Sequence, residues 1–164
     1  MVYQQVSRVA LLNAVVQSQG RQANRNGRVF EDLIAQRLRS EGYVSLTKLP
    51  DKFEFPFFVA QLRGRFSSIY GSPLRVDFFV WHPEKYPNGM IIECKYQETN
   101  GSADEKFPYT VANLRKANIP AVLLIMGRGP KPCSVEWCLK QQDEHLKVFK
   151  DLESFMKSTN RDLF

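Results

Sequence analysis

The sequence predicts a mixed α/β fold, in which a central β-sheet is flanked by helices. Residues 27–42 place apolar side chains at helical spacing, while residues 74–81 and 90–97 are apolar-rich runs of strand length. Residues 119–127 are apolar almost throughout, as in a strand at the centre of a sheet. Helices that alternate with strands pack on the faces of a shared sheet. With 164 residues and no internal repeat, we expect one domain over residues 1–164.

Two helices are expected before the first strand. Residues 4–17 have roughly helical apolar spacing, and the stronger second helix carries an apolar stripe before Gly42 stops it. Residues 43–49 are predicted to form a short strand. Prolines and glycines interrupt residues 50–74, which indicates short strands or hairpins.

The strands at 74–81 and 90–97 are expected to form a hairpin, with its turn at residues 86–89, Tyr-Pro-Asn-Gly. Ser102 and Glu105 match a capping box, but Pro108 lies too deep for a helix begun at Ser102, so a start near Phe107 is expected. The tail is predicted to add a short strand at 147–149 and a helix at 151–157.

Composition narrows the class of protein. Apolar residues make up 43% of the chain and aromatic residues 12%, which is typical of a folded globule. The net charge of +6 favours a polyanionic partner, nucleic acid before a membrane surface. The sequence shows no membrane-spanning run and no secretory signal, and its three cysteines do not form a disulfide framework. We therefore expect a cytoplasmic protein that binds neither a membrane nor a nucleotide cofactor. A zinc site is not expected, because the cysteines and histidines fit no common zinc spacing.

Polar side chains stand where the two central strands should be buried. Glu93 and Lys95 share one strand face, Asp77 interrupts the neighbouring strand, and Glu31 borders the apolar stripe of its helix. Carboxylates grouped in this way repel one another unless a cation lies between them. Mg²⁺ binds oxygen ligands and assists phosphodiester hydrolysis, and a nearby lysine would stabilise charge on the phosphate.

Asp77, Glu93-Cys94-Lys95 and the preceding helical Glu31 together resemble the PD-(D/E)XK nuclease superfamily. Val76 stands where the family pattern has proline. The resemblance covers about residues 27–126 and implies a restriction-endonuclease-like core, a mixed sheet flanked by helices. It also implies that Asp77, Glu93 and the backbone carbonyl of Cys94 bind Mg²⁺, with Mn²⁺ as a substitute.

The resemblance further implies that Lys95 is catalytic and that Glu31 is the helix-borne acid that assists the metal. Gln97, Ser102 and Lys106 are second-rank candidates, because the segment after the motif often adds polar contacts in this family. Basic residues that could contact DNA phosphates form another set, which shares Lys106. These residues are Arg28, Arg63, Arg65, Arg75 and Lys106.

The expected function is that of a Mg²⁺-dependent deoxyribonuclease, an endonuclease of the restriction or homing type or one of a phage or mobile element. A Holliday-junction resolvase of the same fold is an alternative, and a homodimer is expected because one site cuts one strand. A non-catalytic DNA-binding or assembly subunit is a second alternative. An RNA-binding domain is less favoured, because the sequence lacks the glycine-aromatic motif of the common modules.

Overall fold

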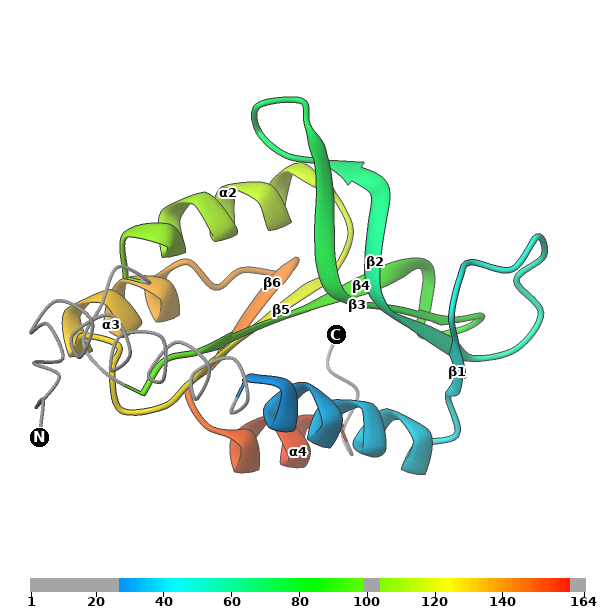
Figure 1. The fold of residues 1–164 in the computed structure, drawn as a ribbon, viewed down its shortest axis with the longest axis horizontal. Coiled ribbons are helices and arrows are strands. Elements are labelled where there is room, and N and C mark those ends of the chain that lie inside the picture. The colour runs from blue at the N-terminus through cyan, green and yellow to red at the C-terminus, as the bar shows by residue number, and fades with distance from the viewer. Residues whose placement is uncertain (1–26, 99–103, 160–164) are drawn as a thin grey trace, which may run out of the picture.

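The structure, a computed structural model, describes residues 27–98 and 104–159 and centres on one six-stranded sheet (Figure 1). The strands lie side by side in chain order. They are β1 (Val44–Leu46), β2 (Phe57–Ser67), β3 (Pro73–His82), β4 (Tyr86–Tyr96), β5 (Ala121–Met126) and β6 (Leu146–Phe149). The strands β2, β3 and β4 pair antiparallel, and the pairs β1–β2, β4–β5 and β5–β6 are parallel. This arrangement confirms the predicted mixed α/β fold.

Helices cover both faces of the sheet (Figure 1). The 27–40 helix and α4 (Leu152–Thr159) lie on one face, and α2 (Phe107–Lys116) and α3 (Pro132–Lys140) on the other. Alternation along the strands supplies a separate apolar core to each layer. Phe78 and Ile92 face the 27–40 helix, whereas Phe79 and Ile91 face α2. None of the described helices is long and apolar enough to cross a membrane.

Several expected elements are present. A helix covers residues 27–40, and the punctuated segment 50–74 contains β2 and the turn that joins it to β3. A 3₁₀ turn, η1 (Asp104–Lys106), precedes α2, which begins at Phe107 and carries proline in its first turn. The sheet continues past residue 126 into β6, so it extends beyond residues 27–126, the core that the family resemblance covers. The expected helix at 4–17 and the capping residue Ser102 lie outside the described residues.

The predicted turn at residues 86–89 is wrong. The turn occupies residues 83–85, and Tyr86 already pairs with His82 as the start of β4. Gly89 has a φ of +89°, and a Cβ atom there would lie 2.2 Å from the Phe79 ring. The Pro-Asn-Gly sequence thus makes an irregularity that lets Phe79 pack against the backbone.

Helix α3 was not predicted. Among its residues only Cys138 is buried, so the segment carries little of the apolar periodicity that identifies a helix in a sequence.

The sheet divides at one point, and that point positions the candidate site. Antiparallel pairing of β3 with β4 stops at Phe78 and Ile92. Beyond it, β3 continues along β2, with Val76 opposite Leu62, while β4 continues along β5, with Glu93 opposite Leu123. Figure 1 shows the β2–β3 hairpin turning away from β4 and β5. Main-chain groups that face the gap therefore need other partners.

Candidate active site

Asp77 and Glu93 face each other across the gap between β3 and β4. The Asp77 amide donates to Glu93 Oε2 at 3.4 Å, and the Cys94 amide donates to Asp77 Oδ2 at 2.8 Å. Each carboxylate thus accepts a hydrogen bond from the main chain of the opposite strand, in place of ladder bonds. Asp77 is only 8% exposed, so its orientation is fixed by packing as well as by this bond.

Lys95 lies on the same strand as Glu93 and contacts it directly. Its Nζ forms an ion pair with Glu93 Oε1. Burial acts to lower the pKa of Lys95, but the charge of Glu93, its hydrogen bond and the charge of Asp77 raise the pKa above its ordinary value. In this arrangement Lys95 is an ammonium that donates hydrogen bonds and does not take up a proton.

Glu31 reaches the site from the 27–40 helix through a residue that the sequence did not single out. Gln61 Nε2 donates to Glu31 Oε2 at 2.7 Å. Gln61 lies on β2 between Ala60 and Leu62, whose partners Phe78 and Val76 flank Asp77. Its φ of +56° is in the left-handed region, which costs a non-glycine residue about 1–2 kcal/mol. No sequence pattern marks such a position, because glutamine has no preference for that conformation.

The site concentrates negative charge in a partly buried place. Burial and the charge of Asp77 raise the pKa of Glu31. Burial also raises the pKa of Glu93, against the effect of Lys95 and together with Asp77. The thiol of Cys94 has its pKa raised well above the ordinary value by burial and by the carboxylates of Asp77, Glu93 and Glu31. A cation at this point would stabilise all of these carboxylates, whereas the thiol stays protonated.

The donor atoms suit a hard cation. Among the described residues, no three histidine, cysteine, aspartate or glutamate side chains form a ready-made metal cluster. Mg²⁺ does not need one, because it binds through one or two carboxylates, waters and substrate phosphate oxygens. Asp77 Oδ1 accepts no hydrogen bond from any described residue, and Glu93 lies opposite with its carboxylate turned to the same gap. Asp77 and Glu93, with the Cys94 carbonyl beside them, therefore fit Mg²⁺.

Two cavities meet at this site, one on each side of the sheet. A cleft of about 600 Å³ is lined by residues that include Glu31, Gln61 and Cys94. A second cavity, of about 250 Å³, is lined by Glu93 on β4, by Tyr109 on α2 and by further residues of β3 and α2. Arg75 and Lys95 line both of them. A substrate strand could therefore contact both cavities while its phosphate lies near Asp77 and Glu93.

Of the five candidate DNA-contacting residues, three line the two cavities and two do not. Arg28 and Arg75 line the larger cleft, and Lys106 lines the smaller one. Arg63 is exposed on β2 opposite Arg75. The guanidinium of Arg65 lies 4.7 Å from the centre of the Phe79 ring, and it also covers two other aromatic rings. Arg65 is thus engaged in packing against the core.

Gln97, a second-rank candidate, is occupied by a turn after β5. Its Nε2 donates to the Gly129 carbonyl at 3.2 Å, and the Gly129 amide donates to the Gln97 carbonyl at 2.9 Å. Gln97 therefore supports the 127–129 segment and not the carboxylate pair.

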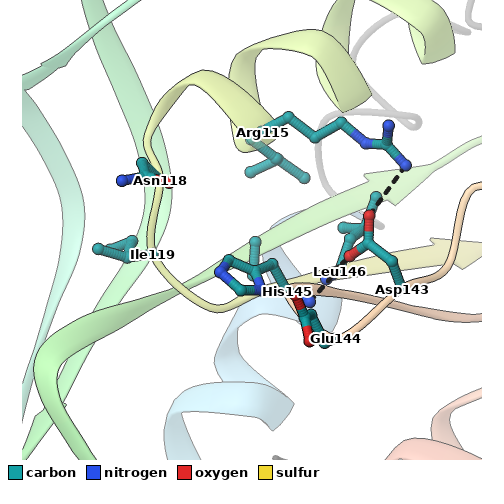
Figure 2. A pocket seen from close by; sticks show the side chains of 9 residues that line it. Arg115, Asn118, Ile119, Asp143, Glu144, His145 and Leu146 are labelled. Carbon is teal, nitrogen blue, oxygen red and sulfur yellow. Dashed lines mark hydrogen bonds and ion pairs between the residues drawn. The ribbon is translucent and has the colours of Figure 1, made fainter.

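A further pocket, of about 370 Å³, lies at the other end of the parallel strands (Figure 2). It is lined by residues at the starts of β5 and β6 and at the end of α2. Its charged groups are engaged with one another: Arg115 Nη2 pairs with Asp143 Oδ2 at 3.1 Å, and Asp143 Oδ1 accepts from the amides of His145 and Leu146 at 2.8 Å each. These bonds fix the 143–146 turn, so we assign the pocket a structural role.

Comparison with known families gave one match. A family model described as the PD-(D/E)XK nuclease superfamily domain matches residues 22–163. No curated protein and no solved structure gave a match. The match covers most of the chain and includes all the strands that surround Asp77, Glu93 and Lys95. The chain therefore belongs to the PD-(D/E)XK nuclease superfamily.

Proposed function

We propose that this nuclease is a Mg²⁺-dependent deoxyribonuclease whose active site is the gap between β3 and β4. One observation carries the proposal: Asp77 and Glu93 face each other where the sheet divides, with the Lys95 ammonium on Glu93. Two fixed carboxylate ligands for a metal, beside an ammonium group, suit metal-assisted phosphodiester hydrolysis. When bound, Mg²⁺ would supply Lewis-acid charge at the phosphate, and Mn²⁺ is expected to replace it.

The side chains would divide the work by position. Asp77 and Glu93, together with the Cys94 carbonyl, would hold the metal. Lys95 would donate a hydrogen bond to a phosphate oxygen or to the attacking water with one of the N–H groups that its ammonium does not use on Glu93. Glu31 lies on the 27–40 helix and not in the sheet, and it would act on the metal through water. Gln61 would be a positioning residue that fixes the Glu31 carboxylate.

Charge and shape support DNA as the substrate. The chain carries a net charge of +6, and Arg28, Arg75 and Lys106 line the two cavities beside the carboxylates. We propose a single nuclease domain that works as a homodimer, since one active site cuts one strand and a two-fold pair would cut both. Activity as an endonuclease of the restriction or homing type, or of a phage or mobile element, belongs to the same proposal.

The test compares supercoiled, linear, single-stranded and four-way-junction DNA in Mg²⁺ and in Ca²⁺. We expect cutting in Mg²⁺ and, in Ca²⁺, binding with little cutting. A strong preference for the junction would favour the resolvase alternative. Binding without cutting in Mg²⁺ or Mn²⁺ would instead favour a non-catalytic subunit and overturn the proposal.

Variants of the site separate chemistry from binding. Lys95→Ala and Asp77→Ala should abolish cutting and leave DNA affinity in Ca²⁺ within a few-fold of wild type. Arg115→Ala, at the pocket in Figure 2, is the matched control and should cut normally. If both site variants cut at the wild-type rate, the assignment of the site is wrong.

A further inference from the structure

Two tyrosines form an exposed stacked pair beside the smaller cavity. Tyr70, in the turn of the β2–β3 hairpin, is 79% exposed, and Tyr109, on α2, is 37% exposed. Their ring centroids are 5.5 Å apart with an interplanar angle of 22°. Because only one face of Tyr70 meets Tyr109, its other face is open to solvent. An aromatic ring this exposed contributes little to the core.

Buried polar groups hold the hairpin turn against α2. The Ile69 amide donates to Asn113 Oδ1 at 2.8 Å, and Lys116 Nζ donates to the Ser68 carbonyl at 2.7 Å. Ser68 is 1% exposed and Asn113 3% exposed. Figure 1 shows the hairpin rising beside α2. Polar side chains are costly to bury unless they are hydrogen-bonded, so this network holds in place the turn that carries Tyr70.

The tyrosine pair is continuous with the candidate active site. Tyr109 lines the cavity of about 250 Å³ that also contains Glu93, Lys95 and Lys106. Lysines in the same cavity supply positive charge for a phosphate, while the tyrosines supply a flat apolar surface at its rim. A phosphate beside a base is the repeating unit of a nucleic-acid strand, and this pairing of features is typical of single-strand binding.

We propose that Tyr70 and Tyr109 form a stacking platform for an unpaired base of the DNA strand whose phosphate enters this cavity. The inference rests on the proposed nuclease function and adds a substrate class. This class is DNA with unpaired nucleotides beside the cleavage point, such as a gapped duplex or a duplex with splayed ends. Bases within an intact duplex are already stacked on their neighbours, so they must unstack before they reach the platform. An unpaired base is free of that cost.

The experiment measures affinity in Ca²⁺ for three DNAs of the same sequence: an intact duplex, a duplex with a three-nucleotide gap and a single strand. Wild type should bind the gapped and single-stranded DNAs about tenfold more tightly than the duplex. Tyr70→Ala should lose this preference, because each base stacked on an aromatic side chain contributes on that scale. Tyr70→Phe keeps the ring and should retain it.

The control is Trp137→Ala, which removes from α3 an aromatic side chain that is 38% exposed, close to the 37% of Tyr109. It should keep the wild-type preference. An equal preference in wild type and Tyr70→Ala, or no preference in wild type, would overturn the inference.

Cutting in Mg²⁺ is scored separately on the same three DNAs. Wild type that cuts duplex DNA yet shows no Tyr70-dependent preference leaves the nuclease proposal in place and overturns the stacking platform alone. A protein that cuts none of these three, nor the supercoiled and four-way-junction DNAs above, overturns the proposed function. The Ca²⁺ comparison of Tyr70→Ala with Tyr70→Phe still decides whether the pair binds bases.

Discussion

Asp77 has a structural and a proposed catalytic role, and two substitutions separate them. Its Oδ2 atom accepts the hydrogen bond from the Cys94 amide, and its charge raises the pKa of both Glu31 and Glu93. Asp77→Asn keeps an oxygen acceptor of the same shape and removes the charge. Asp77→Ala removes the acceptor as well, so the Cys94 amide loses its partner.

The expected sizes follow from these contacts. A hydrogen bond to a charged acceptor contributes about 1.5–3 kcal/mol, so Asp77→Ala should lower the free energy of unfolding by about that amount. For a chain of this size, the loss corresponds to a fall in Tm of roughly 3–12 °C. Asp77→Asn exchanges a stronger hydrogen bond for a weaker one but removes repulsion from Glu31 and Glu93. Its Tm without metal should stay within about 3 °C of wild type.

Thermal unfolding with and without Ca²⁺ measures both effects. Ca²⁺ at ten times its dissociation constant should stabilise wild type by about 1.4 kcal/mol, or roughly 3–6 °C, because it binds only the folded protein. Neither variant should respond. If Asp77→Asn gained as much Tm from Ca²⁺ as wild type, Asp77 would not be a ligand. If Asp77→Ala were as stable as Asp77→Asn, the bond to Cys94 would not stabilise the fold.

Two further predictions concern Glu31 and the glycines. The pKa of Glu31 is raised from 4.5, so the folded metal-free protein binds more protons than the unfolded chain and the free energy of unfolding falls as pH rises above that value. Between about pH 5 and 7.5, the Tm of Glu31→Gln should therefore fall less with rising pH than the Tm of wild type. Curves of Tm against pH that run parallel for the two proteins would contradict this. Gly127 has a φ of +96°, and a Cβ atom there would lie 2.0 Å from the Gln97 carbonyl oxygen, whereas Gly71, at +82°, has open space. In urea unfolding, Gly127→Ala should cost at least about 2 kcal/mol more than Gly71→Ala, and equal losses would show that the contact with Gln97 is unimportant.

The carboxylate pair was visible in the sequence because it breaks a strong pattern. Asp77 and Glu93 are charged residues in strands that are otherwise apolar, and alternation put Glu93 and Lys95 on one face. The exact pairing was not predictable, since the turn was expected at residues 86–89. A turn there would have shifted Asp77 several residues away from Glu93. The register shift between Val80 and His82 and the close packing of Gly89 on Phe79 depend on contacts that a sequence does not display.

The positions of Gln61 and Tyr70 in the fold could not be predicted from the sequence. Gln61 joins the site through a backbone conformation with positive φ that glutamine seldom adopts. Tyr70 looks like one of many aromatic residues until the fold brings it against Tyr109 from 39 residues further along the chain. Local patterns identify elements and their buried faces, whereas contacts between distant segments depend on how those elements pack.

The position of the metal is the most direct test of the active site proposed between β3 and β4. Fe²⁺ loaded in place of Mg²⁺, with peroxide and ascorbate, generates radicals that cut the polypeptide next to the bound ion, and mass spectrometry locates the breaks. We expect breaks near residue 77 and near residues 93–95 in wild type, and neither in Asp77→Asn. Breaks elsewhere in the chain, or the same breaks in the variant, would contradict the proposed site.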